Sequence, residues 1–285
     1  MKLMKKNSNL HVILGCFTTL LITNTTLAQE WSIEGGAHFI NQRKENAFPI
    51  SGKSEGFSVG IGYSKYLNTN WSLNTGISYF NSKINFAASN INGTYNETDM
   101  ENDSFEFRYN VESFEEKIQC SSFRIPLTLQ YETLGIVRWY MRTGVVYDIS
   151  IGNSKYNQNW GNIKTSGYYP QWDAELHGPN YVGFGNMGNL HHEGNFKLQN
   201  NFSWLVETGV KQQLRAVDDI YLGLFFELGL NNIRPKTDAT EKAIVYTKNI
   251  QEPLVYNSVL NQEIYKDKKL ALYTIGFKIR YAIDF

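Results

Sequence analysis

The last fifteen residues, 271–285, alternate strictly between apolar and polar side chains. Large apolar residues occupy every second position, at Tyr273, Ile275, Phe277, Ile279, Tyr281, Ile283 and Phe285. Lys278, Arg280 and Asp284 stand between them. A period of two predicts a β-strand with one apolar and one polar face. Charges on the polar face do not fit the core of a soluble sandwich, and the aromatic residues would otherwise face water. Hydrocarbon outside and a polar interior satisfy both faces, which is the pattern of a transmembrane β-barrel strand.

Seven earlier segments alternate in the same way, and the connections between strands alternate in length. Strands are expected at 31–40, 56–67, 71–80, 121–131, 137–149, 201–214 and 222–230. Short connections at 68–70, 132–136 and 215–219 alternate along the chain with long connections at 41–55, 81–117, 152–197 and 231–269. Short periplasmic turns and long outer loops produce this rhythm in outer-membrane barrels. The sequence therefore predicts an all-β fold, an eight-stranded antiparallel up-and-down transmembrane β-barrel with long extracellular loops.

Residues 105–111 leave the number of strands open. Phe105, Phe107, Tyr109 and Val111 alternate with polar residues inside a predicted loop. They would form either an extra pair of strands, which gives ten, or a hairpin that extends strands 71–80 and 121–131 above the membrane. The hairpin is favoured because no short turn separates this segment from the strand that follows.

The first 28 residues have the pattern of a secretory signal peptide, which leaves 29–285 as the barrel domain. Basic residues precede an apolar stretch at 12–22, and Thr26-Leu27-Ala28 offers a small-residue cleavage site. A lipidation box at Ile13-Leu14-Gly15-Cys16 is the alternative. Cleavage after Ala28 removes three lysines from a chain with 27 basic and 27 acidic residues, so the net charge becomes −3. That balance offers no footprint for nucleic acid, and Cys120, the one cysteine then left, has no partner for an intramolecular disulfide.

The polar faces of the predicted strands carry eleven charged residues. Six are basic and five are acidic: Glu34, Arg124, Arg138, Arg142, Asp148, Glu207, Lys211, Glu227, Lys278, Arg280 and Asp284. Charges removed from water are costly unless they are paired, so a nearly balanced set predicts a lumen filled by ion pairs. A charged pore lining is the alternative. The interior of an eight-stranded barrel is just wide enough for side chains to fill, which favours the filled lumen.

Side chains suited to catalysis or metal binding occur in the loops without a recognisable spacing. Asp99, Glu101 and Asp103 alternate as in a calcium loop but lack its glycine and final glutamate. His177, His191, His192 and Glu193 lack the helical spacing of a zinc site. A surface hydrolase would need a serine beside such a histidine, and no Gly-x-Ser-x-Gly motif is present. The sequence thus predicts no catalytic, metal or cofactor site, and no enzyme.

The segment 152–197 combines aromatic residues with glycine and asparagine, a composition typical of binding loops. Either these aromatic residues form a recognition surface, or they pack on one another as a lid. They are Tyr156, Trp160, Tyr168, Tyr169, Trp172, Tyr181 and Phe184.

Two of the predicted strands and the closing strand resemble the outer-membrane β-barrel family that includes the PorT-type proteins. The resemblance lies in Gly56-Phe57-Ser58-Val59-Gly60-Ile61-Gly62-Tyr63 and in Arg124-Ile125-Pro126-Leu127-Thr128-Leu129-Gln130-Tyr131. Arg124 stands where similar proteins usually carry an acidic residue. The resemblance implies a location in the outer membrane, and PorT-type relatives imply a role beside protein secretion machinery.

We therefore expect a non-enzymatic barrel in the cell outer membrane, whose outer loops bind a partner or ligand or shield the cell surface. A small pore or a secretion accessory is the alternative function, and a surface hydrolase is a further alternative. Expected partners are outer-membrane lipid, the barrel-assembly machinery through the C-terminal strand, and an extracellular ligand or secretion-system protein.

Overall fold

The computed structural model describes residues 28–42, 54–236 and 241–285. The predicted signal peptide therefore lies almost wholly outside the described residues. Within them, no helix is long and apolar enough to cross a membrane.

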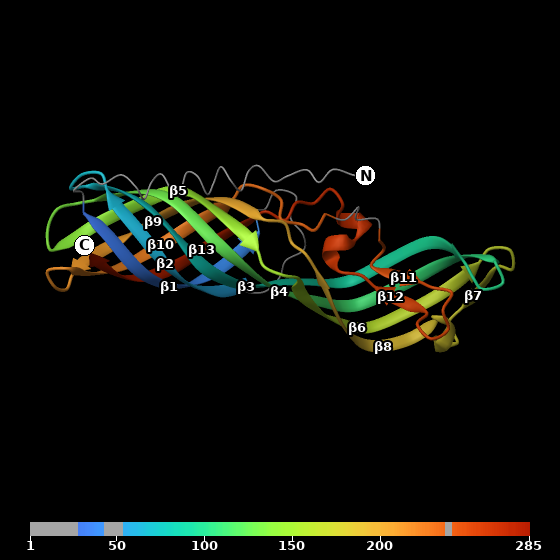
Figure 1. Ribbon diagram of the computed structural model, residues 1–285. Helices are drawn as coiled ribbons and strands as arrows, with labels where there is room; N and C mark the ends of the chain where they lie inside the picture. The colour runs from blue at the N-terminus through green and yellow to red at the C-terminus, as the bar shows by residue number, and fades with distance from the viewer. Residues whose placement is uncertain (1–27, 43–53, 237–240) are drawn as a thin grey trace, which may run out of the picture.

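Eight antiparallel strands form a closed ring (Figure 1). Their order around the ring is β3-β2-β1-β13-β10-β9-β5-β4, and pairing between β3 and β4 closes it. Closure leaves no unpaired edge in the barrel wall, and it confirms the predicted fold. The strands are β1 (Gln29–Gln42), β2 (Ser54–Tyr66), β3 (Trp71–Thr98), β4 (Ser104–Glu132), β5 (Val137–Ser150), β9 (Asn201–Gln213), β10 (Asp218–Gly229) and β13 (Leu272–Asp284).

The two faces of the barrel wall differ as the alternation predicts. On β13, Phe277 is 52% exposed, whereas Arg280, on the opposite face, is 1% exposed. Near the short turns, Trp31 lies against Tyr63, and Tyr131 lies between Trp71 and Trp139. An aromatic row of this kind is typical of the girdle at a membrane–water interface.

Strands β3 and β4 continue well beyond the ring as one hairpin of 28 and 29 residues (Figure 1). Along its C-terminal part, from Ser122, β4 pairs with β5, and along 106–119 it pairs instead with β6 (Ser154–Tyr169). Residues 105–111 therefore belong to the extended hairpin, which confirms that interpretation, and the ten-stranded alternative is wrong. The sheet turns away from the barrel at this point because β4 exchanges its partner.

The segment 152–197, expected to be a loop, is largely sheet. It contains β6, β7 (Ala174–Leu176) and β8 (Gly185–Phe196), with the short 3₁₀ helix η1 (Asn180–Val182) between them. Both β7 and β8 pair with β6. The prediction of a loop was wrong because glycine and asparagine interrupt the period-two alternation in the sequence. The pairing of β6 with β8 is also irregular, with register shifts near Trp160 and Ile163.

Residues 241–269 cover one face of this outer sheet (Figure 1). They contain the β11–β12 hairpin (Ile244–Tyr246 and Leu254–Tyr256) and the 3₁₀ helices η2 (Val259–Asn261) and η3 (Glu263–Tyr265). A second hydrophobic core lies between sheet and cover, separate from the barrel. Its most buried members are Ile84, Phe86, Phe105, Phe107, Val111, Phe114, Ile118, Trp160, Ile163, Ile244, Leu260 and Leu270. We call the sheet of 84–118, β6, β7 and β8 with its cover the extension.

Candidate functional site

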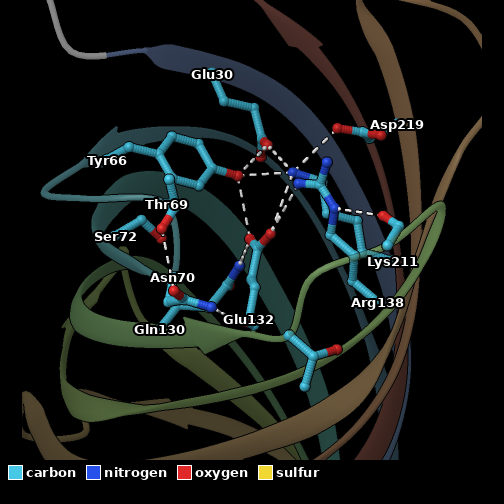
Figure 2. A network of polar contacts seen from close by, with 12 residues as sticks. Glu30, Tyr66, Thr69, Asn70, Ser72, Gln130, Glu132, Arg138, Lys211 and Asp219 are labelled. Atoms are coloured by element: carbon cyan, nitrogen blue, oxygen red, sulfur yellow. Dashed lines mark hydrogen bonds and ion pairs between the residues drawn. The ribbon is translucent and has the colours of Figure 1, made fainter.

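The eleven charged residues that the sequence assigns to the inward faces lie in the lumen, and nine of them take part in the ion pairs described below, which form three levels along the barrel. The level nearest the short turns centres on Lys211. Its Nζ lies 2.9 Å from Glu30 Oε2, 3.0 Å from Asp219 Oδ2 and 3.5 Å from Glu132 Oε2. Arg138 approaches Glu132 from the rim at 3.5 Å. Figure 2 shows Lys211 enclosed by these carboxylates.

The middle level centres on Glu207, which is fully buried. Arg280 Nη2 lies 3.0 Å from its Oε1, Lys278 Nζ lies 3.4 Å from its Oε2, and the hydroxyl of Tyr140 donates a hydrogen bond of 2.9 Å. Lys278 also lies 3.4 Å from Glu34, so the lysine links two strands across the lumen. Beside this group, Arg142 donates to the side-chain oxygens of Gln130 and Asn74.

The level nearest the extension centres on Arg124. Its Nε lies 2.7 Å from Asp148 Oδ1, and its Nη1 lies 2.9 Å from Glu227 Oε2. The guanidinium also lies 3.7 Å from the ring centroid of Phe80. Together the three levels place charged side chains across the whole height of the lumen.

Three acidic residues of the lumen were missing from the sequence prediction. Glu30, Glu132 and Asp219 lie at strand ends that were assigned to turns or left outside the strands, and all three are buried. The signal was present, because Glu30 is in phase with Glu34, Glu132 with Gln130 and Asp219 with Tyr221. The predicted balance of six basic to five acidic residues is therefore wrong, and the described lumen holds eight acidic side chains against six basic ones.

Little free space remains around these side chains. A cavity of about 70 Å³ lies at the junction with the extension, where Arg124, Asp148 and Glu227 meet Ile84 and Leu198. A second, of about 10 Å³, lies beside Glu34 and Arg142. The first space can hold a few water molecules, and the second can hold one at most. The described lumen is filled by side chains, as an eight-stranded barrel allows.

The aromatic residues of segment 152–197 divide between the two alternatives that the sequence left open. Trp160, Tyr169 and Phe184 are buried in the core of the extension, so packing accounts for them, and they are not available for recognition. Tyr156 and Tyr168 are half-buried. Trp172 and Tyr181 are 60% and 64% exposed.

The far end of the extension gathers three turns, 99–103, 170–173 and 248–252, which we call the distal tip. The hydroxyl of Tyr169 donates to Asp99 Oδ2 at 3.0 Å, and Lys248 Nζ donates to Asn102 Oδ1 at 3.2 Å. The indole of Trp172 stacks on Tyr169 with ring centroids 5.2 Å apart. Three turns from distant parts of the chain are thus held against one another, with Met100, Trp172 and Ile250 exposed.

A buried carboxylate, that of Glu116, links the cover to the sheet in addition to the hydrophobic core. Ser258 Oγ donates to its Oε1 at 2.6 Å, and Gln158 Nε2 and the Val259 amide donate to its Oε2 at 2.8 and 3.0 Å. Burial raises the pKa of Glu116 above its ordinary value, and the three hydrogen bonds oppose that rise. Docking of η2 is therefore linked to the protonation of Glu116.

The loop residues considered for metal binding do not form a site in the described part of the chain. Asp99 Oδ1 accepts hydrogen bonds from the amides of Glu101 and Asp103, as expected of a turn. His191 contacts Asn159 and Glu193. Among the described residues, the group of acidic side chains close enough to share a metal ion is instead Glu30, Asp219 and Asp284, in the lumen.

Comparison with solved structures finds bacterial surface and outer-membrane proteins, at low similarity. The chain is 12% identical to Neisserial surface protein A. The match covers 89% of this chain and 97% of that protein, and the two superpose with a TM-score of 0.33. For the attachment invasion locus protein Ail of Yersinia pestis the identity is 10%, the coverage 91% and 100%, and the TM-score 0.32. For the outer membrane protein OprG of Pseudomonas aeruginosa these values are 10%, 91% and 97%, and 0.35.

No curated protein matches the sequence significantly. The model of one protein family does match, over residues 23–234, which is most of the chain. Because the family consists of outer-membrane proteins, the match indicates that the barrel lies in the outer membrane. The narrower resemblance to PorT-type proteins stays a prediction. On its sequence and its closed eight-stranded ring, the chain belongs to the outer membrane protein beta-barrel domain family.

Proposed function

We propose that this protein is a non-enzymatic outer-membrane barrel that is closed to solutes and binds a partner at the cell surface through the distal tip. The observation that carries the proposal is the second hydrophobic core, which lies outside the barrel. A core of this size is not needed to close eight strands. It makes the extension a rigid support, and rigid supports position binding loops.

The exposed residues of the distal tip support a binding role. Trp172, Ile250 and Met100 are 60%, 58% and 41% exposed, although they lie outside the apolar band of the barrel. Exposed apolar side chains held together on one surface mark interaction sites, and a tryptophan among polar turn residues is typical of binding surfaces.

Site-specific photo-crosslinking in intact cells tests the binding role. A photoreactive residue at position 172 should give a covalent adduct, and the further substitutions Met100→Ser and Ile250→Ser should reduce its yield severalfold. The matched control position is Asn195, which is exposed in β8 of the same extension. Equal adducts at 172 and 195, or no adduct at 172, would argue against the distal tip.

A closed lumen predicts no discrete conductance steps when the purified protein is inserted into planar bilayers. The three levels of ion pairs support this expectation, because an ion would have to break buried contacts to pass. Regular steps in the wild-type protein would favour the pore alternative.

The hydrolase alternative has less support. In the described part of the chain no hydrogen bond joins His191 or His192 to a serine, and His191 is held by Asn159 and Glu193. Purified protein should leave lipid and peptide substrates intact. Cleavage that His191→Ala or His192→Ala abolishes would contradict the proposal.

A further inference from the structure

We propose that Glu30, Asp219 and Asp284 form a binding site for a divalent cation, Ca²⁺ or Mg²⁺, at the mouth of the barrel beside the short turns. Three neighbouring strands bring these carboxylates together. Glu30 of β1 is the register partner of Asp284 of β13, and Asp219 of β10 is the partner of Ala282, two residues earlier on the same face of β13. Because side chains alternate with period two, all three point into the lumen.

The three carboxylates lie close to one another. Ala282, which is the register partner of Asp219 on one side and of Ser32 on the other, is a small buried residue beside them. One carboxylate oxygen from each of the three acidic residues lies within 4.8 Å of the other two. Oxygen atoms at such separations can share one hard cation, which prefers carboxylate and water oxygens.

Each of the three carboxylates has one oxygen atom without a hydrogen-bond partner in the described part of the chain. Lys211 Nζ, Tyr66 and Tyr221 all contact Oε2 of Glu30, and Lys211 contacts Oδ2 of Asp219. Within the described residues, Glu30 Oε1, Asp219 Oδ1 and Asp284 Oδ1 are buried and accept no hydrogen bond. Glu30 is wholly buried and Asp219 is 3% exposed. Buried carboxylate oxygens are costly when they lack a partner.

The charges of this level point to a cation of charge two. Glu30, Glu132, Asp219 and Asp284 carry four negative charges, and Lys211 and Arg138 contribute two positive ones. The excess is therefore two negative charges at this level. At the middle level, Arg142, Lys278 and Arg280 outnumber Glu34 and Glu207 by one, so the neighbouring level offsets only one of the two negative charges at the mouth.

Asp284 makes the site accessible. It is half-buried, whereas Glu30 and Asp219 are buried, so the cluster opens toward the mouth of the barrel. Water can supply the remaining ligands of a bound ion there, since Ca²⁺ takes six to eight oxygens and Mg²⁺ retains several waters.

Isothermal titration of the purified full-length mature protein in detergent, stripped of metal and held at constant ionic strength, tests the site. CaCl₂ and MgCl₂ are the probes. We expect one cation per chain and a rise in the unfolding temperature that EDTA reverses. Asp219→Asn and Asp284→Asn should each weaken binding at least tenfold and remove that rise.

The matched control is Asp218→Asn, which removes a carboxylate next to Asp219 that pairs at the surface with Arg215. It should bind like the wild type. Without added cation, Asp284→Asn should unfold at a temperature equal to or above that of the wild type, because it removes one of the repelling charges. The proposal is overturned if 10 mM of either cation has no effect, or if both asparagine variants bind with wild-type affinity. The first result would mean that protons or mobile ions neutralise the carboxylates, and the second that the cation binds elsewhere.

Discussion

Glu207 shows at the scale of one residue why the lumen is sensitive to single substitutions. Its carboxylate is fully buried and accepts contacts from Arg280, Lys278 and Tyr140 at 3.0, 3.4 and 2.9 Å. A buried pair contributes little net stability compared with a well-packed apolar pair, but removing one partner leaves the other charge uncompensated. The stability of the barrel therefore depends on each buried charge keeping its partner, more than on the number of charges.

Replacement of Glu207 by alanine is expected to lower the free energy of unfolding by about 3–5 kcal/mol, because Arg280 would keep a buried charge without its carboxylate. Urea unfolding in detergent, followed by tryptophan fluorescence, measures the change. Glu193→Ala, at an exposed position of the extension, is the control and should change stability by less than about 0.5 kcal/mol. An unchanged midpoint for Glu207→Ala would show that the ion pairs are not formed.

At the scale of one element, the cover of the extension depends on the side chain of Glu116. Glu116, on β4, is the shared acceptor for Ser258 and Val259 of the η2 region and for Gln158 of β6. It thus joins the cover to two strands of the outer sheet. Because burial raises its pKa, the docked cover binds a proton more tightly than the undocked one.

This linkage predicts that docking of η2 depends on pH. The docked carboxyl has a pKa above the ordinary 4.5, so docking is most favourable below about pH 4.5 and weakens as the pH rises through the raised value. Hydrogen exchange of residues 254–262, corrected for intrinsic rates, should show higher protection at pH 5 than at pH 8. Glu116→Gln should flatten that dependence, and Glu106→Gln, at a half-exposed position of β4, should leave it intact. Protection that rises with pH in the wild type would contradict the assignment.

The whole molecule is polarised along the barrel axis. The short turns and both ends of the described chain lie at one end of the barrel, and the extension lies at the other (Figure 1). Since short turns face the periplasm in barrels of this kind, we expect the extension on the outer side of the membrane. The distal tip is then the part of the described chain farthest from the bilayer.

Protease cleavage of intact cells tests this orientation. A protease site inserted between Met100 and Glu101 should be cut from outside, because this turn belongs to the distal tip. The same site inserted between Thr69 and Asn70 should be cut only after the outer membrane is permeabilised. The reverse result would place the extension in the periplasm and remove the basis for a surface partner.

The strands of the barrel and the direction of their side chains follow from the sequence alone. Alternation with period two is a local property, and it placed every predicted lumen charge, from Glu34 to Asp284, on the inward face. It missed Glu30, Glu132 and Asp219 because a strand end in a turn-like context gives too few repeats to count.

The contacts that the long segments make were decided by the tertiary structure alone. Glu116 meets Ser258 across 142 positions, and Lys211 meets Glu30 across 181. No local pattern carries contacts at that separation, because they depend on the register between strands that are far apart in the sequence. The alternation of side chains determined a barrel with a polar interior. The register of its strands decided which acidic side chains meet at the mouth of the barrel, and partner exchange along β4 decided that three supposed loops form one folded body.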